Sequence, residues 1–198
     1  MLRTNDRFLS YIETLYAGET RKEHFQFKIV PEGTMLLRQG SAGARVYVLK
    51  EGISKVFFSE DNGKEYILEF SGRGEIMGEI EVLRQLPCLC SVQALTEVQA
   101  YTISIPFFNA LLEKDPQLNR LLLDVFAERI VNTSSRAAFQ QLYTLEHSVT
   151  RLLEFQSKQQ LQFSKEDMAA YLGITPRSLN RVLKSVQVRS GTAQQQSE

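Results

Sequence analysis

The chain has 198 residues, of which 43% are hydrophobic and 23% are charged, and its formal net charge is zero. This composition is typical of a soluble globular protein of one or two domains, and no run of residues approaches the length and apolarity of a transmembrane span. The N-terminus is polar and lacks a signal-type apolar core, so we expect a cytoplasmic protein. The charge is uneven, because residues 151–198 carry seven Lys or Arg and four Asp or Glu. The last quarter of the chain is therefore its basic part.

The first half of the chain reads as a short helix followed by a series of strands. Residues 4–17 place Phe8, Ile12 and Leu15 on one side of a helix. Runs rich in β-branched and aromatic residues then follow: FQFKIV, VYVLK, ISKVFF, EYILEF, CSVQAL and QAYTISI. The Asn62-Gly63 pair between two of these runs is a strong hairpin signal. Regular short strands of this kind predict an antiparallel barrel or roll over about residues 25–105.

Two cysteines, Cys88 and Cys90, lie in this region, and the chain has only two histidines, His24 and His147. So few ligands predict no metal site within one chain. We interpret both cysteines as small apolar residues that stay reduced in the cytosol.

A long helical pattern follows Pro106, which we take as the end of the strands. It opens at Asp115-Pro116, with Asp as cap and Pro at the first helical position. Its apolar pattern is interrupted at Asn132-Thr-Ser-Ser135 and resumes through Ala138, Leu142 and Leu145. Its apolar stripe can cover the β domain or form a dimer seam. We expect one end of the helix to pack on the β domain and the other end to pair with a second copy of the chain. The stripe consists of Leu118, Leu121, Leu122, Val125, Phe126 and Ile130.

Residues 164–185 have the pattern of a helix-turn-helix. Ser164 with Asp167 begins a first helix, and Gly173 permits a tight turn. Thr175 and Pro176 then suit the start of a second helix. Apolar and basic residues occupy different faces of that helix: Leu179, Val182, Leu183 and Val186 on one, Arg177, Arg181 and Lys184 on the other. Such a basic face can enter the major groove of DNA, although a solvated surface hairpin would have the same pattern.

Taken in order, these features resemble the CRP/FNR family of bacterial transcription regulators over nearly the whole chain. Its motifs are matched by Gly33 with Arg38-Gln39-Gly40, by Tyr47 through Gly52, by Gly78-Glu79-Ile80 and by the helix-turn-helix. The run GEIEVL followed by SVQAL is similar to the YeiL-type branch. The resemblance implies an α+β fold with three parts, at residues 1–110, 111–146 and 147–198. These are a cyclic-nucleotide-binding-like antiparallel β-roll, a dimerisation helix and a winged-helix-type DNA-binding domain.

The cassette that binds the cyclic phosphate in the family departs from its pattern here. Glu79 stands at the position that meets the ribose, but Cys88 stands at the position of the phosphate-pairing arginine. A cysteine cannot supply the bidentate cation that a buried phosphate needs. We therefore expect an unknown effector, or none, and not cyclic AMP. The resemblance places a candidate pocket at Gly78, Glu79, Ile80, Cys88, Leu89, Thr133 and Ser134.

A second departure is the polar tail after Val186, which has little strand signal where the family has a two-stranded wing. We expect this tail to be disordered and the wing to be missing or vestigial.

The sequence thus predicts a homodimeric regulator and not an enzyme. The partners that the family implies are double-stranded DNA, a second copy of the chain, RNA polymerase and a small-molecule effector, with no membrane. Arg177 and Arg181 are assigned to base edges, and Thr175, Ser178 and Lys184 to phosphates or adjacent bases. Two alternatives remain: a sensor or interaction module that has lost DNA binding, and a cupin-type metalloenzyme, which would need clustered ligands that the chain lacks.

Overall fold

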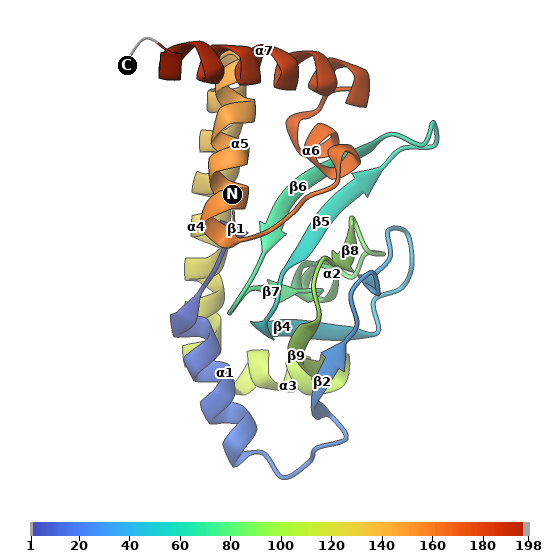
Figure 1. The fold of residues 1–198 in the computed structure, drawn as a ribbon. Coiled ribbons are helices and arrows are strands. Elements are labelled where there is room, and N and C mark those ends of the chain that lie inside the picture. Colours follow the sequence, from blue (N-terminus) through green and yellow to red (C-terminus); the bar gives the residue numbers. More distant parts are fainter. Residues whose placement is uncertain (1, 196–198) are drawn as a thin grey trace. The chain divides into compact units, whose positions relative to one another are not determined.

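The computed structural model describes the backbone of residues 2–195 and the side chains of residues 2–186. The chain forms two compact units, divided between Val125 and Phe126 (Figure 1). The predicted bounds 1–110, 111–146 and 147–198 remain a prediction, because one long helix runs across the observed division. None of the helices in the described part of the chain is long and apolar enough to cross a membrane.

The first unit is a two-sheet roll, which confirms the predicted fold. One sheet has the strand order β1-β6-β5-β8-β3 and the other β2-β9-β4-β7. The pairs within these sheets are antiparallel, except that β1 runs parallel to β6. The strands are β1 (Leu2–Arg3), β2 (Phe25–Val30), β3 (Met35–Leu37), β4 (Arg45–Glu51), β5 (Ser54–Ser59), β6 (Glu65–Ser71), β7 (Ile76–Met77), β8 (Ser91–Ala94) and β9 (Val98–Ser104).

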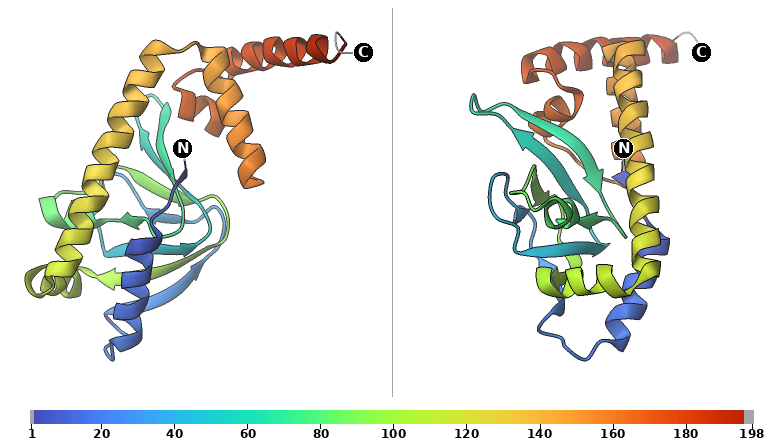
Figure 2. Two further views of the ribbon diagram at one scale, coloured as in Figure 1. Left: turned by 90° about the vertical axis from the view of Figure 1, so that its left-hand side faces the viewer. Right: turned by 180° about the vertical axis from the view of Figure 1, so that it is seen from behind.

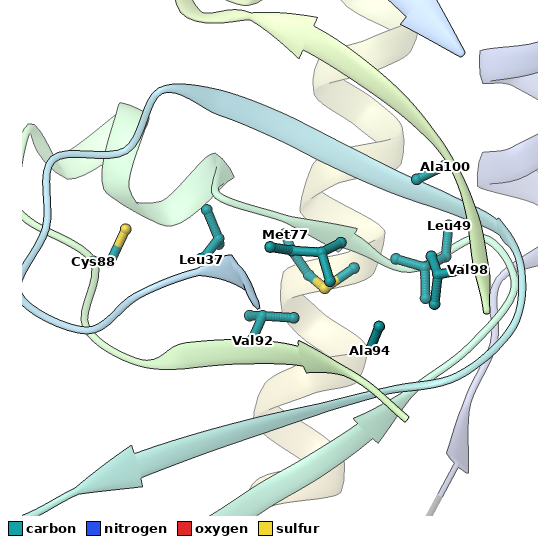
Figure 3. Close-up of a cluster of buried hydrophobic side chains, with 9 residues drawn as sticks. Leu37, Leu49, Met77, Cys88, Val92, Ala94, Val98 and Ala100 are labelled. Atoms are coloured by element: carbon teal, nitrogen blue, oxygen red, sulfur yellow. The ribbon is translucent and has the colours of Figure 1, made fainter. Parts of the chain in front are cut away.

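A buried apolar cluster lies between the two sheets (Figure 3). Val92 and Ala94 of β8 come from one sheet, and Leu49 of β4 and Val98 of β9 come from the other. Strand side chains alternate between faces, so each sheet turns one apolar face inward. The predicted hairpin at Asn62-Gly63 is confirmed, since Glu60 N–H donates to Lys64 O at 2.9 Å and Gly63 has a φ of 77°.

Helices α1 (Asp6–Gly18), α2 (Glu79–Arg84) and α3 (Ile105–Lys114) complete the roll with the start of α4 (Pro116–Leu142). Pro106 does not simply end the β region, as the sequence suggested; it lies in the first turn of α3, where a missing N–H costs nothing. The hydroxyl of Tyr11 on α1 donates to Asp115 Oδ2 at 2.5 Å. The other oxygen of Asp115 accepts the N–H groups of Gln117 and Leu118 and caps α4 as predicted.

Helix α4 runs unbroken through residues 132–135, where the apolar pattern of the sequence is interrupted (Figure 2). Asn, Thr and Ser each cost less than about 1 kcal/mol inside a helix, which the propagating helix tolerates. Leu118, Leu121, Leu122 and Val125 are buried, whereas Leu123 and Ile130 are exposed. The part of the stripe before Phe126 therefore packs within the first unit, as expected for one end of this helix.

The second unit consists of the remainder of α4 with α5 (Leu145–Gln159), α6 (Lys165–Leu172) and α7 (Pro176–Gln195). The sequence pattern does not separate α5 from the long helix. The predicted disorder after Val186 is wrong as far as Gln195, because α7 continues to that residue. Extending an existing helix adds a hydrogen bond for each residue without a new nucleation cost. Residues 196–198 of the predicted tail lie outside the described residues.

Candidate functional sites

The helix-turn-helix of the second unit begins with a capped helix. The backbone N–H of Asp167 donates to Ser164 Oγ at 3.0 Å, and this hydroxyl donates to Asp167 Oδ2 at 2.9 Å. Helix α6 ends at Gly173, which has a φ of 69°. There Ile174 N–H donates to Ala169 O at 3.0 Å, which closes the turn in a Schellman arrangement. Ser164 and Gly173 therefore begin and end this helix, as the sequence predicted.

Thr175 fixes the start of α7. Its Oγ1 accepts the backbone N–H of Ser178 at 3.2 Å, and its hydroxyl donates to Ser178 Oγ at 3.1 Å. This places Thr175 in the cap, and Ser178 retains a hydroxyl proton for an outside acceptor. Leu179 and Val182 are buried, which orients the helix on the core of the second unit.

The three predicted cations of α7 are all on its exposed side. Arg177, Arg181 and Lys184 are exposed, at a spacing of four and three residues. With respect to residues 2–186, none of their side chains has a hydrogen bond or an ion pair. An uncommitted guanidinium can meet a guanine edge or a phosphate in a bidentate geometry. A ridge of such groups on a rigid helix is the arrangement that the major groove accepts.

A contact that the sequence did not reveal joins α4 to α6 within the second unit. Arg136 Nη2 donates to the backbone oxygen of Tyr171 at 2.6 Å, and its guanidinium carbon lies 4.1 Å from the centre of the Tyr171 ring. These residues are 35 positions apart. No local spacing could have paired them, since the contact depends on the packing of separate helices.

The cassette of the first unit begins with a turn that requires glycine. Gly78 has a φ of 89°, and a Cβ at this position would lie 2.8 Å from Arg45 O. Glu79 follows as the first residue of α2 and is only 1% exposed, while Ile80 is partly exposed. The motif Gly78-Glu79-Ile80 thus forms the expected strand-to-helix turn.

The other end of the cassette does not provide a cation site. Cys88 is 3% exposed and belongs to the buried apolar cluster, whereas the next side chain, Leu89, is 60% exposed (Figure 3). Burial raises the pKa of the Cys88 thiol, so it remains neutral at pH 7. Arg84, which is close in sequence, is exposed on the last turn of α2. These residues do not fit a buried cyclic phosphate, which needs positive charge or a ring of donors.

The seven predicted pocket residues are therefore divided by burial. Glu79 and Cys88 are buried, and Ile80 and Leu89 face outward. Thr133 and Ser134 are exposed on α4 in the second unit. Their sharing of one ligand pocket with the cassette stays a prediction. Cys88 and Cys90 are free thiols, and burial raises the pKa of Cys90 to about 11.

Comparisons with known proteins agree with this architecture. Residues 27–115 match the model of the cyclic nucleotide-binding domain. The chain is 29% identical over 161 residues to the probable transcriptional regulator flp of Lacticaseibacillus casei, covering 78% of this chain and 73% of that protein. It is 21% identical over 175 residues to the cAMP-activated global transcriptional regulator CRP of Salmonella typhimurium, with 83% of each covered.

These matches make the chain a relative of the CRP/FNR regulators. Among solved structures, the c-di-GMP responsive global regulator CLP of Xanthomonas campestris has the same fold, with a TM-score of 0.77 and 21% identity over 91% of this chain and 92% of that one. The names of these three relatives describe regulators, and those of CRP and CLP name different nucleotides.

Proposed function

We propose that this CRP/FNR-family chain is a DNA-binding transcription regulator that reads DNA with helix α7. The observation that carries the proposal is the uncommitted basic face of Arg177, Arg181 and Lys184 on a helix whose opposite face is buried. Arg177 and Arg181 lie in the N-terminal half of α7, the part of a recognition helix that contacts base edges. Lys184, one turn further along, contacts the phosphate backbone.

The proposed regulator acts as a homodimer through α4. The exposed positions 123, 127, 130, 134, 137 and 141 recur at alternating intervals of four and three residues, the spacing of a coiled-coil seam. Leu123 and Ile130 supply large apolar side chains to this face. A two-fold axis along the seam would present two recognition helices to successive major grooves, about 34 Å apart, on a palindromic site.

Single alanine variants test the DNA reading. Arg181→Ala should cost about 1–3 kcal/mol on the preferred site and relax the preference at one base pair. Lys184→Ala should weaken all sequences alike and reduce the slope of log affinity against log salt by about one. Arg84→Ala removes an exposed arginine from the roll and serves as the matched control, with no effect on affinity.

Binding would be measured by fluorescence anisotropy on sites selected from random DNA, at several salt concentrations. Equal behaviour of Arg181→Ala, Lys184→Ala and the Arg84→Ala control would contradict the assignment of α7. A wild type without salt-sensitive DNA binding would favour the alternative of a sensor or interaction module. That alternative has one observation in its favour: the residues after Val186 continue α7 as far as Gln195 and do not form the strands of a wing.

A further inference from the structure

A small pocket opens on the roll between the loop of residues 38–44 and the segment that follows α2. Its volume is about 200 Å³. Leu37 of β3, Tyr47 of β4 and Cys88 contribute to its wall, and Figure 3 shows Leu37 and Cys88 at the same end of the buried cluster. The lining does not include Gly78, Glu79 or Ile80, so the pocket is separate from the turn of the cassette. At roughly 30 Å³ for each water molecule, it holds about seven waters, less than a drug-sized ligand requires.

The lining combines an apolar wall with two donors. Met35, Leu36, Leu37, Ala42, Ala44 and Cys88 are apolar, and Arg38 carries the charge of this lining. Neither the guanidinium of Arg38 nor the hydroxyl of Tyr47 forms a hydrogen bond with any other residue that the structure describes. Burial raises the pKa of Tyr47, which keeps its hydroxyl protonated and able to donate.

The lining of the pocket carries one positive charge, on Arg38, and no carboxylate. The neutral Cys88 thiol adds no negative charge to the wall. Glu81 lies close enough to raise the pKa of that thiol, but it is not part of the lining, and its Oε1 accepts the backbone N–H of Leu89 at 3.2 Å. An acceptor-only group that enters the pocket would therefore meet donors without displacing an existing partner of Arg38.

The walls are held together before any ligand enters. Gly40 N–H donates to Cys88 O at 2.8 Å, and Cys88 N–H donates to Ser41 O at 2.9 Å. These two backbone bonds fix the loop against the segment after α2. A preformed site of this kind loses less conformational entropy on binding than a mobile loop would.

We propose that this pocket binds a small monocarboxylate with an apolar body, of the size of benzoate or hexanoate. The carboxylate pairs with Arg38, whose planar donors match its two oxygens, and the apolar body rests against Leu37, Tyr47 and Cys88. One cation suits a monoanion better than a phosphate, and the volume of about 200 Å³ suits a small apolar body. The site lies outside the helix-turn-helix, so this inference does not depend on DNA binding.

The test uses the full-length protein labelled for NMR and titrated with benzoate, hexanoate and benzamide. Benzamide has the shape of benzoate without its charge. We expect benzoate and hexanoate to shift the signals of the pocket residues at millimolar concentration and benzamide to bind at least about tenfold more weakly, since a hydrogen bond to a charged group contributes about 1.5–3 kcal/mol. Arg38→Gln should weaken benzoate binding by a similar factor. Arg84→Gln, the same change on exposed α2, should leave it unaltered.

Three results would overturn the proposal. Benzoate and hexanoate could both leave the pocket signals unmoved, benzamide could bind as well as benzoate, or Arg84→Gln could weaken binding as much as Arg38→Gln, which would indicate a general charge effect. Arg38 is exposed, so its replacement should not unfold the roll. Tyr47→Phe gives a second measurement, because it keeps the ring and removes only the hydroxyl, and a few-fold loss of affinity is expected.

Discussion

Two adjacent leucines of α4 should affect different properties when each is replaced by alanine, the stability of the fold in one case and the affinity of the dimer in the other. Leu122 is 3% exposed and lies in the core of the first unit, whereas Leu123 is 65% exposed on the proposed dimer seam. Leu122→Ala should cost about 2–5 kcal/mol of folding free energy through lost burial and an unfilled cavity. For a chain of this size, that cost lowers Tm by roughly 4–20 °C.

Leu123→Ala should change the stability of the monomer by no more than about 0.5 kcal/mol, as is usual for an exposed site. It should instead weaken the dimer. Burying a leucine contributes about 1.5–3 kcal/mol, and a symmetric seam holds two copies. The dissociation constant of the dimer should therefore rise by roughly 10²- to 10⁴-fold.

Thermal melting followed by circular dichroism at high dilution measures the first effect, and sedimentation equilibrium measures the second. The reasoning is refuted if Leu123→Ala lowers the Tm of the monomer as much as Leu122→Ala does. It is also refuted if the wild type sediments as a monomer at micromolar concentration, because the exposed stripe would then have no second copy to cover it.

Two further predictions concern protonation and the cassette. The hydrogen bond from Tyr11 holds the pKa of Asp115 below its usual range, so this pair stabilises the fold above the unfolded pKa, and the contribution is lost as pH falls below about 4. Tyr11→Phe should therefore flatten the fall in Tm between pH 5 and pH 3. An unchanged fall in Tm over this pH range would count against the pair. Calorimetry should detect no cyclic AMP binding, and Cys88→Arg should destabilise the roll instead of creating a phosphate site, because the side chain at this position points into an apolar core. Tight nucleotide binding by that variant would show this to be wrong.

The parts of the fold that could be predicted are those with a strong local pattern. The run FQFKIV became β2, and the cap and turn residues from Ser164 to Thr175 gave the helix-turn-helix. Strands β3 and β7 have three and two residues, too few for any periodicity to be visible. Helix α3 was missed because a proline can end a strand or begin a helix, and the sequence does not distinguish these roles.

The candidate sites divide in the same way. The exposure of Arg181 follows from its position relative to Leu179 and Val182 on a single helix. The pairing of Arg136 with Tyr171 depends on how separate helices pack, and the position of Cys88 beside Leu37 depends on how separate strands pack. The opposite directions of Cys88 and Leu89 also arise from the path of an irregular segment, for which sequence spacing has no rule.

The two backbone hydrogen bonds beside the pocket allow the separation of its walls to be measured by amide hydrogen exchange. The amide protons of Gly40 and Cys88 are both engaged between the two walls, at 2.8 and 2.9 Å. Neither proton can be replaced by deuterium unless the loop and the segment after α2 separate, so their exchange rates measure the free energy of that separation. A ligand that binds the preformed pocket with its walls closed would slow both exchanges together and would leave an unrelated amide, such as that of Glu60 in the hairpin, at its original rate.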